Sequence, residues 1–133
     1  MWVCSMWLRP FSIACLAGIY NVMHDKNIKA GRITKSMTFS QKVWALTARV
    51  PRGKVTTYGE IARKLGCRGA RAVGNAMNRN PYAPVVPCHR VVGKDGALTG
   101  FSDGLARKNR MLLAEGIVLK GQQVDMRKSF MRL

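Results

Sequence analysis

Residues 55–80 read VTTYGEIARKLGCRGARAVGNAMNRN, two short segments of helical composition separated by a glycine turn. In the first segment, Thr57 can accept a hydrogen bond from the backbone N–H of Glu60 while the Glu60 side chain reaches back, which forms a capping box. The apolar face of this predicted helix consists of Ile61, Ala62 and Leu65. Gly66 is expected to end it.

The second segment, GARAVGNAMNR at residues 69–79, predicts another helix, which stops at Asn80-Pro81. Two short helices joined by a tight turn in a basic chain favour a helix-turn-helix. Any pair of small packed helices has a similar pattern, so the pattern alone leaves both interpretations open.

Arg71 stands among residues with almost no side chain: Gly69, Ala70, Ala72, Gly74 and Ala76. A helix that reads the major groove usually carries several long polar side chains that meet base edges. Small residues instead let the backbone approach a duplex closely and leave one long cation to act alone. This composition favours contact with the minor groove and one intruding arginine, whereas close helix packing would explain the alanines only.

The regions on either side of this pair predict further helices. Val43, Leu46 and Val50 recur at helical spacing after Ser40, a plausible N-cap, and Pro51-Arg52-Gly53 ends the pattern. A later helix over residues 102–116 has Ser102 as its expected N-cap and Gly116 as its stop. Its expected core positions are Leu105, Leu112 and Leu113.

Short extended stretches surround the last helix. VVGKDGALTGF, at residues 91–101, predicts a strand, a Lys-Asp-Gly turn and a second extended stretch, and residues 117–124 predict a last strand. Residues 125–133 have the composition of a frayed basic tail. The fold class expected is therefore mainly α with a small β element, a winged-helix-like helix-turn-helix domain.

The N-terminal part of the chain is less regular. Residues 24–37 are polar and basic and have the composition of a linker. Residues 11–23 are apolar, but this run is too short to span a bilayer and lacks a convincing signal-cleavage site. We expect a buried helix there, or a poorly chosen start codon.

Composition limits the classes of partner. The chain has 133 residues, enough for one domain, and its formal net charge is +17. A basic excess spread over a folded domain points first to nucleic acid, although a solvated basic surface or a ribosome-associated protein has the same charge. None of the four cysteines (Cys4, Cys15, Cys67 and Cys88) lies in a C-x-x-C pair, and only two histidines are present. These counts argue against a structural zinc site, and we expect reduced thiols in an intracellular protein.

One cysteine occupies an unusual context. Residues 83–92, APVVPCHRVV, place Cys88 and His89 in an apolar run held by Pro84 and Pro87. A structural cysteine needs no neighbouring histidine, but a nucleophilic one does, because the thiolate is the reactive form and a nearby base helps to produce it.

Five ordered blocks now stand together: TTYGEIA, RAVGNAMNRNP, PCHRVV, GFSDGL and LLAEG. Over about residues 38–121 this combination resembles the DNA-binding, active-site domain of the O6-alkylguanine-DNA alkyltransferases, the methylated-DNA–protein-cysteine methyltransferases. The resemblance implies that Cys88 attacks the alkyl carbon on guanine O6 and keeps the alkyl group. It implies that His89 takes the thiol proton through a water and that Glu115 orients the histidine.

The same resemblance implies a set of DNA-binding residues. Tyr58 would donate to the target base and help to rotate its nucleotide out of the duplex, and Arg71 would fill the vacated place. Ser102 would bind O6, the backbone around Cys88 and Val91 would accept from the exocyclic amine, and Asn80 would brace the segment before the active-site loop. Extrusion is needed because a buried thiol cannot reach O6 of a stacked guanine.

The chain departs from the family pattern at two pocket positions and at its N-terminus. Phe101 stands where the family often has Tyr. Asp103 stands where the family often has Gly, and we expect this acid near the pocket rim to alter tolerance for bulky adducts. Residues 1–37 form a short, atypical N-terminal segment in place of the usual α/β N-terminal domain. We therefore divide the chain into residues 1–37, an unassigned segment and linker; 38–121, the alkyltransferase domain; and 122–133, a basic tail.

The function expected is stoichiometric, irreversible repair of O6-alkylguanine in double-stranded DNA by a monomer, with no cofactor, metal or membrane. O4-alkylthymine is left open as a second substrate. The compartment expected is intracellular: the cytoplasm in a prokaryote, the nucleus in a eukaryote. The alternative is a non-catalytic alkyltransferase-like protein that recognises damage, a class that lacks the acceptor cysteine. A Cys-His hydrolase or a basic winged-helix regulator would leave Arg71 or the PCHR motif without a role.

Overall fold

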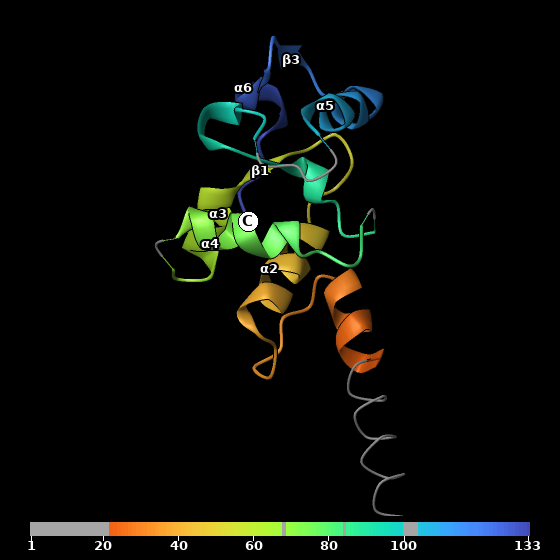
Figure 1. Ribbon diagram of the computed structural model, residues 1–133, viewed down its shortest axis with the longest axis vertical. Helices are drawn as coiled ribbons and strands as arrows, with labels where there is room; N and C mark the ends of the chain where they lie inside the picture. Colours follow the sequence, from red (N-terminus) through yellow and green to blue (C-terminus); the bar gives the residue numbers. More distant parts are fainter. Residues whose placement is uncertain (1–21, 68, 84, 100–103) are drawn as a thin grey trace, which may run out of the picture.

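The computed structural model describes residues 22–67, 69–83, 85–99 and 104–133 (Figure 1). Residues 22–29 are helical. The elements that follow are α2 (Phe39–Ala48), β1 (Thr56–Thr57), α3 (Tyr58–Lys64), α4 (Ala70–Asn78), η1 (Cys88–Arg90), β2 (Val91–Val92), η2 (Lys94–Gly96), α5 (Leu105–Ala114), β3 (Leu119–Lys120), β4 (Gln123–Val124) and α6 (Met126–Ser129). The fold is mainly α with a small β element, as the sequence predicts.

The predicted pair of helices is α3 and α4. Thr57 caps α3 by accepting a hydrogen bond from the Glu60 N–H at 3.0 Å, but only half of the predicted capping box forms. The Glu60 carboxylate instead accepts two hydrogen bonds from Arg63, at 2.6 and 2.9 Å. Gly66 follows α3 with φ +70°, a left-handed conformation that glycine adopts without strain.

Helix α2 joins the pair into one core. Its N-cap is Thr38, which forms a capping box with Gln41, so the predicted cap at Ser40 is two residues late. The Trp44 indole N–H donates to the Ala76 carbonyl at 2.8 Å and ties α2 to α4. The buried residues of this core are Val43, Leu46, Ile61, Ala62, Val73, Ala76, Met77 and Val91.

Strands β1 and β2 pair in parallel, with Thr56 opposite Val91 and Thr57 opposite Val92. Because β1 leads into α3 and β2 follows η1, this pairing places the start of α3 beside the loop that carries Cys88. A second core lies behind the strands and consists of Val55, Val92, Leu98, Leu112, Ile117 and Val124.

Helix α5 differs from its predicted burial pattern. Leu112 is fully buried, as expected, but Leu105 and Leu113 are 41% and 54% exposed. Lys108, which the predicted core of this helix did not include, is also fully buried. The cap of α5 is Gly104, and Ser102 lies outside the described residues.

The C-terminal segment is ordered by pairing, so the frayed tail predicted for residues 125–133 is wrong. After the β3–β4 hairpin and α6, Phe130 forms a parallel bridge with Val55. The Val55 N–H donates to the Ser129 carbonyl at 2.9 Å, and the Met131 N–H donates to the Val55 carbonyl at 2.8 Å. Figure 1 shows this segment passing β1 and ending beside α3.

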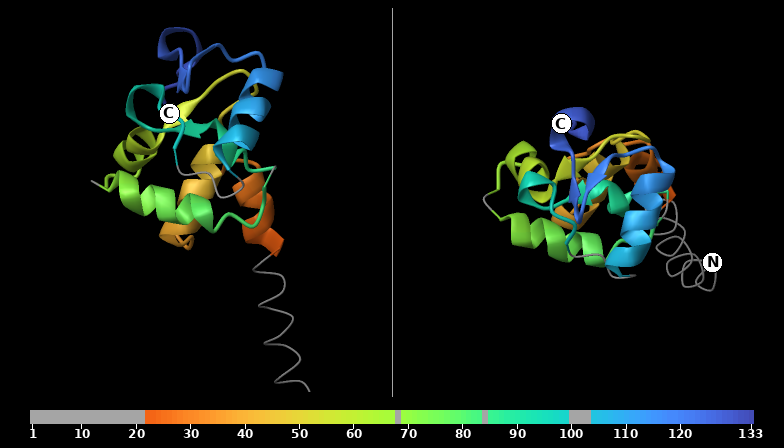
Figure 2. Two further views of the ribbon diagram at one scale, coloured as in Figure 1. Left: turned by 45° about the horizontal axis from the view of Figure 1, so that its top comes forward. Right: turned by 90° about the horizontal axis from the view of Figure 1, so that it is seen from above.

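The N-terminal residues also pack on the domain, so residues 24–37 are not an isolated linker. Ile28 and Met37 are buried with Val86, a residue of the Cys88 loop. The Tyr82 hydroxyl donates a short hydrogen bond to the Asp25 carboxylate. Figure 2 shows the helix over residues 22–29, in orange, beside this loop. The prediction of a linker followed the polar composition of the segment and overlooked its two buried apolar residues, Ile28 and Met37.

Candidate active site and DNA-binding surface

The Cys88 loop is held from behind by backbone and amide hydrogen bonds. The Asn80 side-chain amide donates to the Val86 carbonyl at 3.1 Å, and the Tyr82 N–H donates to the Asn80 side-chain oxygen at 2.9 Å. The Cys88 N–H donates to the same Val86 carbonyl at 2.9 Å. Asn80 thus fixes the backbone two residues before the thiol, in the place where the sequence predicted a brace.

Cys88 begins the 3-10 turn η1, directly after Pro87. Its side chain is partly buried. Cys67 is a second described thiol, and both cysteines pack against the core of the helix pair, but Cys88 is directly followed by a histidine and Cys67 is not. Cys4 and Cys15 lie outside the described residues. Cys88 is therefore the described thiol that borders the predicted histidine and glutamate.

His89 and Glu115 meet directly, although they are far apart in sequence. The His89 Nε2 atom lies 2.8 Å from the Glu115 carboxylate. Arg90 donates to the same carboxylate from its Nε, at 2.9 Å, and from Nη2, at 2.8 Å. It also donates to the Val50 carbonyl at 2.7 Å. Sequence reasoning gave Arg90 no role, although it follows the histidine in the PCHR motif.

Charge and burial set the protonation states of this pair. Burial lowers the pKa of His89 below its usual 6.5, even though the Glu115 carboxylate opposes the change. Burial raises the pKa of Glu115, but hydrogen bonds from Arg90 and His89 outweigh it, so the net pKa is lowered. The result is a neutral imidazole beside an ionised carboxylate at neutral pH. With Nε2 donating to Glu115, Nδ1 is the ring nitrogen that can accept a proton.

Lys108 is a site residue that sequence reasoning missed. Its ammonium donates to the Val91 carbonyl at 2.5 Å and to the Thr99 carbonyl at 3.1 Å. Burial lowers its pKa to about 8, while Cys88 acts in the opposite direction. A detectable signal did exist, since Lys108 lies three residues after Leu105 and four before Leu112, on the apolar stripe of α5. A carbonyl oxygen has two lone pairs, so Val91 keeps acceptor capacity for a guanine amine.

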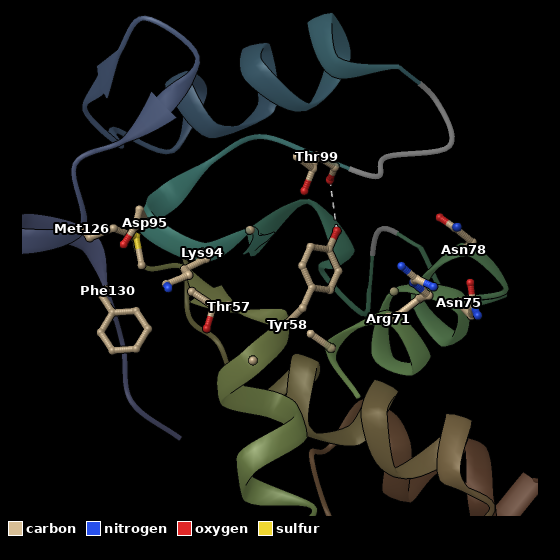
Figure 3. A pocket seen from close by; sticks show the side chains of 14 residues that line it. Thr57, Tyr58, Arg71, Asn75, Asn78, Lys94, Asp95, Thr99, Met126 and Phe130 are labelled. Atoms are coloured by element: carbon tan, nitrogen blue, oxygen red, sulfur yellow. Dashed lines mark hydrogen bonds between the residues drawn. The ribbon is translucent and has the colours of Figure 1, made fainter. Parts of the chain in front are cut away.

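A pocket of about 590 Å³ opens between the helix pair and residues 91–99, which contain β2 and η2 and are called the wing below (Figure 3). Tyr58 and Arg71 both line it. The Tyr58 hydroxyl donates to the Thr99 carbonyl at 3.1 Å, and burial together with Cys88 raises the pKa of Tyr58 to about 12. Since Cys88 itself does not line the pocket, Tyr58 links the pocket to the thiol.

The face of α4 toward this pocket is more polar than the sequence suggested. Asn75 and Asn78 line the pocket with Arg71, and all three side chains are exposed. Their spacing of i, i+4 and i+7 marks one helix face, which the emphasis on small residues concealed. Ala70 and Gly74 lie in the same lining, so the close backbone approach predicted for α4 remains available there.

The structure therefore brings most of the predicted residues into two adjoining groups. Cys88, His89 and Glu115 lie on one side, and Tyr58 and Arg71 line the pocket. Ser102, Phe101 and Asp103 lie outside the described residues. Within the described ranges, no cluster of three or more His, Cys, Asp and Glu side chains could hold a metal ion. No helix in that part of the chain has the length and apolar composition to cross a membrane.

Comparison with known proteins identifies the same family that the sequence motifs resemble. A family model described as the DNA-binding domain of 6-O-methylguanine DNA methyltransferase matches residues 38–117. A methylated-DNA–protein-cysteine methyltransferase of Methanosarcina acetivorans is 49% identical over 79 residues, which cover 59% of this chain and 51% of the relative. The chain spans about half the length of such methyltransferase relatives.

Other relatives match over more of their length. A DNA base-flipping protein of Escherichia coli is 35% identical over 114 residues, 84% of this chain and 88% of that protein. Atl1 of S. pombe, solved with damaged DNA containing O6-carboxymethylguanine, has a TM-score of 0.64 at 32% identity, covering 71% of this chain and 95% of Atl1. OGT of Mycobacterium tuberculosis, solved with DNA, has a TM-score of 0.57 at 40% identity, covering 71% and 65%. The chain belongs to the 6-O-methylguanine DNA methyltransferase family, whose DNA-binding domain model it matches over residues 38–117.

Proposed function

We propose that this protein repairs O6-alkylguanine in duplex DNA by transferring the alkyl group to its own Cys88. The observation that carries the proposal is the position of the Cys88 thiol directly before His89, which is buried and lies 2.8 Å through its Nε2 from the Glu115 carboxylate. A neutral histidine oriented by a carboxylate is the arrangement that activates a thiol. The pocket that Tyr58 shares with Arg71 supports a DNA-bound substrate.

The proposed chemistry is a direct displacement at the alkyl carbon. The thiol proton passes through one water to Nδ1 of His89, because Nε2 is engaged with Glu115 and Nδ1 has no hydrogen-bond partner among the described residues. As the sulfur–carbon bond forms, the bond between the alkyl carbon and O6 breaks and its electron pair stays on the guanine. The guanine then takes up the proton, so a thioether and an ordinary guanine result. Since no step restores the thiol, each molecule reacts once.

Base extrusion precedes this step in the proposal. Tyr58 and Arg71 line one pocket on the surface of the helix pair, and the net charge of +17 favours binding to phosphates. Tyr58 would rotate the nucleotide and Arg71 would occupy its place in the stack. Ser102 is proposed to bind O6, and the carbonyl of Val91 to accept from the guanine amine.

A second candidate is recognition of damage by base flipping without transfer. It is favoured by the Escherichia coli base-flipping protein, which matches this chain over 88% of its own length. The two functions separate in one experiment, in which excess protein is incubated with a duplex containing O6-methylguanine and the DNA is then hydrolysed. Transfer converts O6-methylguanine to guanine in proportion to the protein added, whereas recognition alone leaves it intact on bound DNA.

The pH dependence of transfer should report the state of His89. Because burial lowers the pKa of His89, its neutral form persists below pH 6.5, and the rate should fall only at lower pH as the ring is protonated. Single-turnover rates on a free benzylated guanine base, measured across this pH range, would show the fall in rate on the acid side. His89→Gln should remove that fall. A midpoint above the ordinary histidine value would contradict the assignment.

Loss of the Lys108 charge should make the transfer rate fall at alkaline pH. The pKa of Lys108 is about 8, so the ammonium near Cys88 is lost above that pH and the thiolate loses a stabilising cation. The parent rate should decline above about pH 8. Lys108→Met, which keeps the side-chain length, should be slower at neutral pH and lack the decline. The exposed Arg107→Met is the matched control; an unchanged fall at alkaline pH in Lys108→Met would refute this role.

A further inference from the structure

The pocket beside α4 has an apolar end built by the C-terminal segment. Figure 3 shows Phe130 and Met126 at one end of the pocket and Arg71, Asn75 and Asn78 at the other, with Tyr58 between them. Phe130 is 37% exposed. Both apolar residues lie outside residues 38–117, the range that the family model matches. The helix pair therefore accounts for only part of this pocket.

Phe130 is held in place by its backbone rather than by its side chain. It bridges Val55, and hydrogen bonds between Val55 and residues 129 and 131 fix the backbone on both sides of it. The Lys54 ammonium also donates to the Lys128 carbonyl at 3.3 Å. The fixed backbone presents the partly exposed phenyl ring at a defined place, so little backbone freedom remains to be lost on binding.

The C-terminal segment, from Gln122 to Met126, packs against the wing. Leu98 N–H donates to the Gln122 carbonyl at 3.2 Å, and Ala97 bridges Gln123. A Cβ on Gly96, which has φ +85°, would collide with the backbone oxygen of Val124 and approach the Met126 side chain. The turn that carries Lys94 thus rests directly on the segment that presents Met126 and Phe130.

We propose that Phe130, together with Met126, is a second DNA contact. Its ring would pack on the sugars of the DNA strand that passes over the turn carrying Lys94. This inference rests on the proposed function, because the pocket is continuous with Tyr58 and Arg71, the residues assigned to base extrusion. Lys94 in the same lining supplies a cation for the adjoining phosphate. Apolar side chains at a groove contact sugars and bases, and arginine and lysine contact the phosphates around them. The two ends of the pocket would then grip DNA on opposite sides of the lesion.

The test is duplex binding by Phe130→Ala, with Phe39→Ala as the matched control. Phe39 is 39% exposed, nearly the same as Phe130, but does not line the pocket. We expect Phe130→Ala to weaken binding to an O6-methylguanine duplex by about tenfold, as loss of an aromatic contact to DNA does. Phe130→Tyr should restore it, and Phe39→Ala should bind like the parent. Hydroxyl-radical cleavage, which reports sugar exposure, should show protection lost on one flank of the lesion only.

Other outcomes would overturn the proposal. Unchanged duplex binding in Phe130→Ala would mean that the apolar end faces another partner. Equal losses on duplex DNA and on a free benzylated guanine base would mean that Phe130 supports the fold. Binding is measured with Cys88→Ala present in every variant, which prevents transfer. A protein with Cys88 intact that binds the duplex but transfers nothing would then refute the proposed function alone.

Discussion

Cys88→Ala should abolish alkyl transfer and leave binding to O6-methylguanine DNA nearly unchanged. The thiol is the only part of the site that forms a bond to the alkyl carbon in the proposed reaction, and no nearby group can replace it. The pocket proposed to face DNA is lined by other residues, among them Tyr58 and Arg71, so the substitution leaves that surface intact. Transfer is measured by loss of O6-methylguanine from the duplex, and binding by titration of the same duplex.

The chain provides a matched control for this substitution. Cys67 is another partly buried thiol, but unlike Cys88 it has no histidine next to it in the sequence. Cys67→Ala should therefore transfer at a rate close to that of the parent. Transfer that survives in Cys88→Ala, or that disappears in Cys67→Ala with the fold retained, would refute the assignment of the acceptor.

Arg71→Ala should slow repair of duplex DNA while sparing a free base. Unstacking a nucleotide costs about a few kcal/mol, and a side chain that fills the vacated place offsets that cost. Its removal should slow transfer from duplex O6-methylguanine by roughly 10- to 100-fold. Transfer from a free benzylated guanine base, which needs no extrusion, should be almost normal. Single-turnover rates on the two substrates give the comparison.

The controls separate extrusion from chemistry. Arg79→Ala removes an exposed arginine at the opposite end of α4, where it is the C-cap and does not line the pocket, and should affect neither substrate strongly. His89→Ala and Glu115→Ala should slow both substrates alike, because they act on the thiol. An Arg71 variant that is equally impaired on both substrates would show that Arg71 supports the pocket rather than the extruded state.

Local sequence rules predicted the helices but not all of their contacts. Thr57, Gly66 and the small residues of α4 each determine local backbone geometry, so the helix pair could be predicted from short segments. The ends were less certain, because Thr38 and Ser40 are equally good caps by type and only the reach to Gln41 decides between them. Glu60 reached Arg63 instead of its own cap, a choice between two nearby partners that composition does not reveal.

The candidate site was predictable where it depends on a motif and obscure where it depends on tertiary contacts. The PCHR motif and the family resemblance identified Cys88 and His89, and Glu115 was found the same way. Lys108 was missed because a lysine on an apolar stripe is usually assigned to the surface, whereas here two backbone carbonyls receive its ammonium in the interior. Phe130 and Val55 pair in space but lie far apart in the sequence, so no local sequence pattern could predict their contact.

The central claim, that Cys88 is the alkyl acceptor, is tested most directly by mass spectrometry. The intact protein is weighed before and after incubation with excess O6-methylguanine duplex and is then digested for peptide mapping. The account predicts that each molecule gains the mass of one CH2 group and no more, on the peptide that contains Cys88. An adduct on Cys67, repeated turnover with no adduct, or an unchanged mass on fully bound DNA would contradict it.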